Sequence, residues 1–262
     1  MINFRTYGNP PYKIAVIHGG PGAPGYMAPV ASELSVNFGI LEPMQTEDSI
    51  KGQTDELYNL LNEHAQTPFT LAGHSWGGFL GLIFASQHPE LVSRIILISS
   101  GPFEDNYVAR LKQTRNSRLS HDDTEEIKKI GQSLNDPEIV NKKELLEKLG
   151  KLTSRADSFK PIPANSEVIE YRPEIHNKVW NEAVKMRHEG KFIEIIKNLK
   201  CPVIAIHGDY DPHPFEGVIE PFKKYKKDFE FHLLKKCGHY PWLEKYAKDK
   251  FYEILNKALH QI

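Results

Sequence analysis

One serine of this chain stands between glycines in a setting that favours nucleophilic chemistry. Residues 68–85 read PFTLAGHSWGGFLGLIFA and contain a G-x-S-x-G pattern centred on Ser75. Residues 69–72 have strand character, whereas the apolar residues after Gly77 recur at helical spacing. A strand that turns at once into a helix brings backbones close together and strains the residue between them, so the turn needs glycines. The pattern predicts a nucleophilic Ser75. A plain strand-to-helix turn is the alternative.

A serine nucleophile requires a base within hydrogen-bonding reach and a third group that orients the base. Among the twelve histidines, His239 follows a predicted strand and lies in a loop after Gly238. A loop histidine can place its imidazole over the strand ends, which a helix histidine such as His188 cannot easily do. We therefore predict that His239 is the base, with a purely structural histidine as the alternative.

The orienting acid is expected between the serine and the histidine, at the end of a strand. Residues 207–214 read HGDYDPHP and supply Asp209 and Asp211. We favour Asp211 because it lies farther into the loop, whereas Asp209 is placed to fix the turn through its own backbone. Asp209, Glu104 and Asp105 remain alternatives. The cluster His207, Asp209, Asp211 and His213 could also suggest a metal, but no paired-ligand spacing accompanies it, so we expect no metal and no cofactor.

Two backbone amides are candidates for an oxyanion hole, the pair of donors that stabilises the negative oxygen formed during acyl transfer. Trp76 follows the serine at the start of the predicted helix, where N–H groups lack intrahelical partners. Gly20 lies in the loop His18-Gly19-Gly20-Pro21-Gly22, where glycines allow close approach to a substrate and proline cannot donate. A tight turn shaped only by sterics is the alternative, and His18 is expected to be structural.

The elements that must position these residues alternate between strands and helices. Strands are expected at residues 13–17, 39–44, 69–72, 92–99, 201–207 and 228–234, with residues 2–7 as a further candidate. Helices are expected at residues 27–36, 55–64, 215–227 and 243–259. Alternation of this kind predicts an α/β fold with a mostly parallel sheet flanked by helices, whose ligands bind beyond the carboxyl ends of the strands.

Residues 103–190 differ from the rest because they are densely charged and have helical spacing. We interpret them as a helical cap inserted into a core domain made of residues 1–102 and 191–262. Helix starts are expected at His121 and at Asp136-Pro137, and an extended connector at residues 158–163. Arg110, Arg115 and Arg118 could line a pocket, but a solvated helix face is the favoured interpretation.

Composition excludes several classes of protein. Of 262 residues, 26% are charged with a net charge of -1, which gives no overall attraction to nucleic acid or to an anionic membrane. The N-terminal residues lack the apolar stretch of a signal peptide, and no apolar run is long enough to span a membrane. The expectation is a cytoplasmic protein whose partner is a small molecule or a short peptide substrate.

Taken together, these motifs resemble the α/β-hydrolase superfamily, and HGGPG with G-x-S-W-G-G resembles its proline iminopeptidase-like branch. The resemblance implies a triad of Ser75, Asp211 and His239, oxyanion donors at Gly20 and Trp76, and hydrolysis of a small ester or an N-terminal amide bond, as in an esterase or an aminopeptidase. The acidic residues with which iminopeptidases hold a substrate amine have no clear match; Glu104, Asp157, Glu170 and Glu174 are the candidates. A ligand-binding protein that keeps the hydrolase fold with little turnover is the alternative.

The two cysteines are predicted to be free thiols. Cys201 precedes one predicted strand and Cys237 follows its neighbour, so they should lie about one strand length, roughly 17 Å, apart, too far for a disulfide. A thiol titration of the denatured, non-reduced protein should therefore give two equivalents. Fewer than two equivalents would contradict the prediction.

Overall fold

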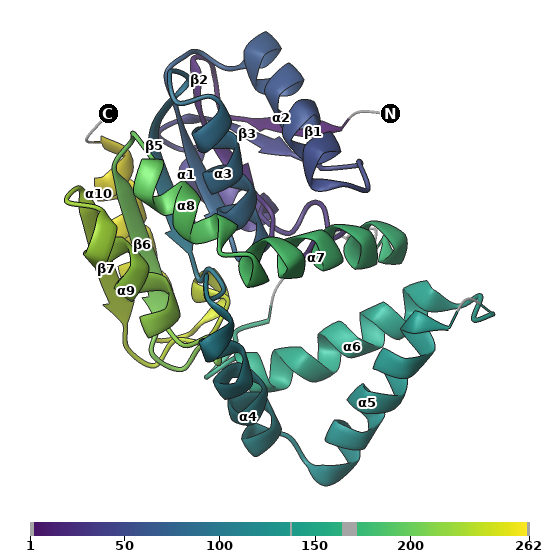
Figure 1. The fold of residues 1–262 in the computed structure, drawn as a ribbon. Coiled ribbons are helices and arrows are strands. Elements are labelled where there is room, and N and C mark those ends of the chain that lie inside the picture. Colours follow the sequence, from purple (N-terminus) through teal and green to yellow (C-terminus); the bar gives the residue numbers. More distant parts are fainter. Residues whose placement is uncertain (1–2, 137, 164–171, 261–262) are drawn as a thin grey trace.

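A computed structural model describes residues 3–136, 138–163 and 172–260. These residues form a seven-stranded sheet with the strand order β1-β3-β2-β4-β5-β6-β7 (Figure 1). The strands are β1 (Phe4–Tyr7), β2 (Tyr12–Ile17), β3 (Gly39–Pro43), β4 (Phe69–His74), β5 (Val92–Ile98), β6 (Val203–Gly208) and β7 (Phe229–Leu234). Strand β1 runs antiparallel to β3, and the other neighbouring pairs are parallel. The predicted mostly parallel sheet is confirmed, as is a strand within residues 2–7, although Ile2 itself lies outside the described residues.

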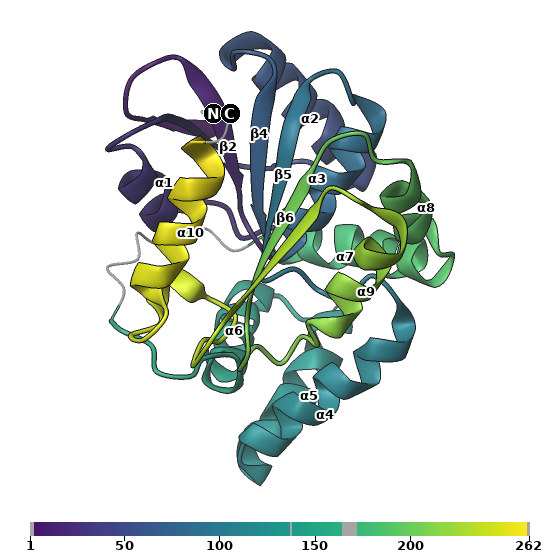
Figure 2. The same cartoon turned by 90° about the vertical axis from the view of Figure 1, so that its left-hand side faces the viewer.

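Helices cover both faces of the sheet (Figure 2). Helices α1 (Ala28–Leu34) and α10 (Lys248–His260) pack on one face, and α2 (Ile50–His64), α3 (Trp76–Gln87), α8 (Lys191–Asn198) and α9 (Glu216–Tyr225) pack on the other. Successive side chains of a strand point to opposite faces, and in β2 Ile14 and Val16 join the first layer while Ala15 and Ile17 join the second. The strands are therefore apolar on both sides, which explains their nearly continuous hydrophobic runs.

The central pair of elements is β4 followed by α3. All six residues of β4 are buried, and α3 is buried from Trp76 to Ala85. A helix that is apolar on all sides must lie inside the protein, because each of its faces needs an apolar neighbour. The turn between β4 and α3 is thereby held by the most deeply packed part of the core.

The register of the sheet brings separate loops together at the carboxyl ends of its strands. Ile17 at the end of β2 is paired with Gly73 near the end of β4. Gly208 at the end of β6 is paired with Leu234 at the end of β7. The loop after β2 consequently lies beside the β4–α3 turn, and the loops after β6 and β7 lie beside each other.

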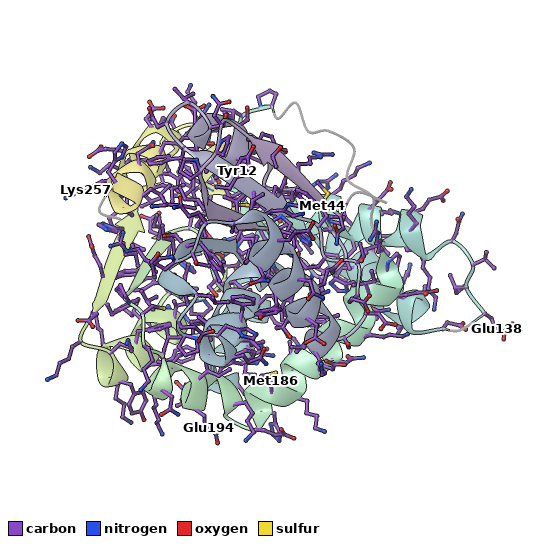
Figure 3. The ribbon with its side chains drawn as sticks, turned by 90° about the horizontal axis from the view of Figure 1, so that it is seen from above. Tyr12, Met44, Glu138, Met186, Glu194 and Lys257 are labelled. Carbon is purple, nitrogen blue, oxygen red and sulfur yellow. The ribbon has the colours of Figure 1, made fainter. Side chains whose placement is uncertain are left out.

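Three helices stand outside these layers: α4 (Val108–Arg118), α5 (His121–Asn135) and α6 (Lys142–Asp157) (Figure 1). Figure 3 shows Glu138, between α5 and α6, at the outer end of this unit and far from Tyr12 at the start of β2. The unit has a small apolar cluster of its own, whose buried members are Ile130, Leu134, Leu146 and Leu152. Helix α7 (Pro173–His188), by contrast, contributes Ile175, Val179 and Ala183 to the cluster under the sheet. The exact boundaries of the predicted cap, residues 103–190, stay a prediction.

Two helix predictions were wrong in detail. The last helix was expected from residue 243, but a short 3₁₀ turn (Pro241–Leu243) comes first and α10 begins at Lys248. The Glu244 side chain accepts backbone N–H groups of Phe159 and Lys160, and these tertiary hydrogen bonds hold the segment before α10 out of the helix. The helix expected at Asp136-Pro137 is also absent, since α5 ends there and α6 begins at Lys142; Pro137 lies outside the described residues.

The remaining expected elements are present. Helix α2 begins earlier than predicted because the Ser49 side chain accepts the N–H of Gly52 and caps it. Residues 158–163 form the expected extended connector, and Cys201 and Cys237 are both unpaired. Among the described residues, no helix combines the length and the apolar character needed to cross a membrane.

Two glycine variants should separate a steric requirement from ordinary helix propensity. A Cβ at Gly77 would lie 2.3 Å from the backbone oxygen of Ile17, whereas a Cβ at Gly131 in α5 would meet nothing within 4 Å. Gly77→Ala should lower the free energy of unfolding by about 3 kcal/mol or more, because backbone cannot yield as a side chain can. Gly131→Ala should raise it by about 0.5–1 kcal/mol. Urea unfolding of both variants measures the difference; equal effects would contradict the steric explanation.

Candidate active site

Ser75 occupies a strained position at the tip of the β4–α3 turn. Its φ of 49° and ψ of -113° lie in a region that residues with a side chain rarely adopt. A Cβ on Gly73 would approach the backbone oxygen of Gly77 to 2.2 Å, so the crossing of strand and helix requires glycine. Ser75 is half-buried, while every other residue from Phe69 to Ala85 is buried. The geometry therefore exposes one hydroxyl on a rigid support.

His239 and Asp211, which come from neighbouring loops, meet through a hydrogen bond. His239 Nδ1 lies 2.8 Å from Asp211 Oδ2, and the Asp211 side chain has no exposed surface. Because an ionised carboxylate only accepts, His239 donates from Nδ1 and its Nε2 is left as the basic nitrogen. This is the tautomer that a general base needs.

A second histidine shares the same carboxylate. Both the backbone N–H and Nδ1 of His213 donate to Asp211 Oδ1, at 2.9 and 2.7 Å. The imidazoles of His213 and His239 stack with their centroids 4.3 Å apart. A third histidine, His207, lies with Nε2 3.4 Å from Asp211 Oδ2 and donates to the His213 backbone oxygen. One buried carboxylate thus fixes two loops at once.

The electrostatics of this cluster favour an ionised Asp211 beside neutral His213 and His207. Burial by itself would raise the pKa of Asp211, but the surrounding His239, His213 and His207 hold it well below its usual range. Burial lowers the pKa of His213 to about 4, against the attraction of Asp211, and it also lowers the pKa of His207. The carboxylate therefore carries its charge throughout the physiological range.

His74, the residue before Ser75, connects the β4–α3 turn to the loop of His239. Its Nε2 donates to the backbone oxygen of His239 at 2.9 Å, and the two rings lie 4.8 Å apart. Burial, followed by repulsion from His239, keeps the pKa of His74 well below 6.5. Ser75 and His239 are thus held through a neutral side chain that contacts the backbone of the base.

The loop after β2 lies against the serine. A Cβ on Gly19 would be 2.5 Å from Nδ1 of His74 and 3.1 Å from the Cβ of Ser75, so this loop can approach the β4–α3 turn only as glycine. Gly20 has a φ of 57° and Trp76 is the first residue of α3. The Trp76 ring is anchored away from the turn, because its Nε1 donates to Gln53 Oε1 at 3.0 Å.

The alternative acids point elsewhere. The Asp209 carboxylate accepts the backbone N–H of Cys237 at 3.4 Å and lies 3.7 Å from Lys235 Nζ, so it braces the next loop instead of its own turn. Asp105 pairs with Arg187 and His188 on α7. Neither of these carboxylates contacts His239.

The residues that could together hold a metal in the structure differ from the set suggested by the sequence. Among the described residues, ligand atoms of Asp211, His213 and His239 lie within 4.8 Å of one another. Each Nδ1 already donates to a carboxylate oxygen, and stacked rings do not converge their lone pairs on one point. The arrangement is that of a hydrogen-bond network around Asp211.

His18 has the structural environment that the sequence suggested. It is fully buried, with Nδ1 3.0 Å from the backbone oxygen of Gly19, and burial lowers its pKa to about 4. A neutral, buried imidazole supports the glycine loop.

The hollow of about 490 Å³ lined by Lys13, Phe38 and His260 lies at the opposite end of the strands from Ser75.

The solvated face expected for the α4 arginines was wrong for two of the three. Arg115 forms two hydrogen bonds with the buried carboxylate of Asp157, at 2.8 and 2.7 Å. Arg118 donates to the backbone oxygens of Ala156 and Tyr210. Arg110, 57% exposed and paired with Glu216, is the one that fits the expectation.

Sequence reasoning missed several residues of the site. His213 entered only as a possible metal ligand, His74 was given no role, and Arg115 was expected on a solvated helix face. His213 could have been found from its position two residues after Asp211, where an aspartate side chain readily accepts a backbone N–H. The tertiary contacts of His74 and Arg115 leave no local signal.

Comparison with known proteins agrees with this fold. A sequence model described as "alpha/beta hydrolase fold" matches residues 46–246. The chain belongs to this family.

Individual relatives are more distant. The cis-3-alkyl-4-alkyloxetan-2-one decarboxylase of Shewanella oneidensis is 26% identical over 104 residues, which are 34% of this chain and 33% of that protein. The curated relatives are matched over less than half of their own length.

Two solved structures show the shared fold over almost the whole chain. The crystal structure of VinJ has a TM-score of 0.70 at 18% identity and covers 98% of this chain and 94% of that one. A thermophilic esterase from Thermogutta terrifontis has a TM-score of 0.64 at 18% identity, covering 98% and 92%.

The buried histidines should make the fold sensitive to acid. His18, His74, His207 and His213 have lowered pKa values in the folded protein. The unfolded chain therefore binds more protons below about pH 6.5, so stability is lost as the pH falls from there. For His18 and His213, whose pKa values in the folded protein are about 4, the loss continues toward that pH and reaches on the order of 3 kcal/mol each at most.

Urea unfolding between about pH 7 and pH 5 measures this loss. His18→Gln should weaken the pH dependence, whereas His121→Gln, at an exposed position, should leave it unchanged. Stability that rises as the pH falls would contradict the prediction.

Proposed function

We propose that the protein is a serine hydrolase that works through an acyl-enzyme on a small ester or an amide bond. His239 Nε2 accepts the proton of Ser75 Oγ as Oγ forms a bond to the substrate carbonyl carbon. The tetrahedral intermediate collapses, the bond to the leaving group breaks, and the leaving group takes the proton from His239. A water molecule, activated in the same way, then releases the acyl group and restores the serine.

The observation that carries the proposal is the hydrogen bond from His239 Nδ1 to the buried, ionised Asp211. It fixes the imidazole in the tautomer that can take a proton at Nε2, and it stabilises the imidazolium formed in the transition state. The strained backbone of Ser75 supports the same role, because strain of this kind persists where the surroundings enforce it and clusters at functional sites.

The backbone amides of Gly20 and Trp76 are the proposed oxyanion donors. Trp76 begins α3, where the N–H groups have no intrahelical acceptor and the helix dipole favours a negative charge. The close approach of the glycine loop to Ser75 supports Gly20 as the second donor. No cofactor takes part in this mechanism.

The positions of the acidic residues suggested for binding a peptide amine limit the class of substrate that the site can accept. Asp157 is committed to Arg115, and Glu174 is exposed on α7. Glu104 is half-exposed at the start of the inserted helices, and Glu170 lies outside the described residues. This distribution favours an ester, or an amide without a charged amine, over the N-terminal peptide bond expected of the iminopeptidase-like branch.

The alternative is a ligand-binding protein that retains the fold and little turnover. The oriented Asp211–His239 pair favours the enzyme, since a receptor gains nothing from an imidazole held in the basic tautomer. In either case the helices within residues 103–190 form the proposed cap over the site.

Ser75→Ala should remove activity. Loss of a member of such a triad lowers kcat by about 10⁴-fold or more, measured with a short-chain chromogenic ester. Ser86→Ala on the same helix is the matched control, because Ser86 is exposed and its hydroxyl bonds only within the helix. Near-native turnover by Ser75→Ala would refute the mechanism.

A fluorophosphonate probe separates the enzyme from the ligand-binding alternative. The probe should label the wild type and Ser86→Ala but not Ser75→Ala, because only an activated serine reacts. Comparing a proline arylamide with a short acyl ester on the same preparation then tests the substrate class, and faster cleavage of the arylamide would favour the aminopeptidase.

A further inference from the structure

The buried ion pair between α4 and α6 lies directly beside the proposed catalytic base. The Asp157 side chain is 2% exposed and accepts two hydrogen bonds from the Arg115 guanidinium, which is itself 28% exposed. Burial would lower the pKa of Arg115, but the charge of Asp157 raises it, so the guanidinium stays charged. A buried carboxylate of this kind stays in place only while its partner does.

The same residue holds the base through its backbone. Asp157 accepts the backbone N–H of His239 at 2.7 Å. A Cβ on Gly238 would come within 2.1 Å of this Asp157 oxygen, so the loop of the base is packed tightly against the end of α6. The Glu244 carboxylate stabilises the packing of this loop against the end of α6, because it accepts the backbone N–H groups of both Gly238 and Phe159.

A second arginine of α4 reaches the loop of the acid. Arg118 Nη1 donates to the backbone oxygen of Ala156 at 2.8 Å and to that of Tyr210, the residue before Asp211, at 2.6 Å. Its guanidinium also lies 3.6 Å above the centroid of the Tyr210 ring. One planar group therefore joins α4, the end of α6 and the loop that carries the acid.

We propose that Arg115, Asp157 and Arg118 are positioning residues for the Asp211–His239 pair. The ends of α4 and α6 that carry these three residues form the root of the inserted helices. In this proposal the root holds Asp211 and His239 in their relative positions, in addition to the role of the helices as a cap over the site. This inference rests on the proposed function, but it concerns residues that do not touch the reacting atoms.

The proposal has an electrostatic signature. The titratable and charged side chains that surround His239 are those of Asp211, His213, His207, His74, Tyr240, Cys237, Glu244 and the Arg115–Asp157 pair. Within this set the ion pair is neutral overall. Removing one partner leaves a net charge near the base, and the sign of that charge depends on which partner is lost.

Two single variants test this signature through the acidic limb of the pH profile of kcat/KM, which reports the pKa of the free base. Asp157→Asn leaves the Arg115 cation, disfavours the imidazolium and should move the limb to lower pH. Arg115→Met leaves the Asp157 anion and should move the limb to higher pH. A structural role alone would lower stability in both variants and move neither limb.

Arg118 is tested by its effect on positioning. Arg118→Met should lower kcat by about ten- to a hundredfold with little change in KM, because small displacements of catalytic groups are costly. Arg118→Lys should restore part of kcat. Arg110→Ala is the matched control, since Arg110 lies on the same helix but is exposed and pairs with Glu216 of α9.

A readout independent of turnover completes the experiment. The low-field proton resonance of His239 Nδ1–H, recorded by NMR in the wild type, should shift in Asp157→Asn and Arg118→Met and stay unchanged in Arg110→Ala. If Arg115→Met fails to fold, the apolar double variant Arg115→Met/Asp157→Leu, with no leftover charge, should fold and keep the wild-type acidic limb.

The proposed hydrolase function and the proposed positioning role can be refuted independently of each other. Absence of fluorophosphonate labelling in the wild type would overturn the proposed hydrolase, while the proton resonance would still test the positioning of His239. Asp157→Asn and Arg118→Met could instead keep the wild-type kcat, the wild-type acidic limb of the pH profile and the wild-type resonance of His239 Nδ1–H. This result would overturn the positioning role and leave the proposed hydrolase function intact.

Discussion

The buried carboxylate of Asp211 is the constraint on which this end of the molecule depends. An ion removed from water costs several kcal/mol unless hydrogen bonds replace its hydration. Here the replacement comes from His239 on one loop and from the side chain and backbone of His213 on another. The two loops cannot separate without leaving a bare charge in the interior, so the satisfaction of one anion also orients an imidazole.

Ser75, the proposed nucleophile, is held by a different kind of force. Ser75 keeps its unfavourable backbone angles because β4 and α3 are packed on every side and cannot relax. His74 connects the packed β4–α3 turn to the hydrogen-bond network around Asp211, because its imidazole donates to the backbone oxygen of His239. Apolar packing thus fixes where the hydroxyl stands, and a charge network fixes where the imidazole stands.

Local patterns were sufficient for the sheet and for placing Ser75, Asp211 and His239 in turns and loops that follow its strands. Apolar runs identified the strands, glycines identified the turns, and the carboxyl ends of parallel strands necessarily share an edge, which brought Asp211 and His239 together. Contacts over long sequence distance left no such signal. The sequence around Glu244 has helical character, but hydrogen bonds to residues 159 and 160 outweigh it, and the arginines of α4 look like a solvated face until Asp157 is seen opposite them.

The packing of residues 155–162 against the loop of residues 237–245 bears on how such a protein can change its specificity. The outer part of the inserted helices has an apolar cluster of its own, and Figure 3 shows Glu138 at its outer end. Its root shares hydrogen bonds with the segment that carries His239. New insertions can therefore be exchanged freely only beyond that root, because a foreign root would bring a foreign partner for the backbone of the base. The tip can be exchanged, whereas the root is structurally part of the core that carries Asp211 and His239, although it is separate from that core in sequence.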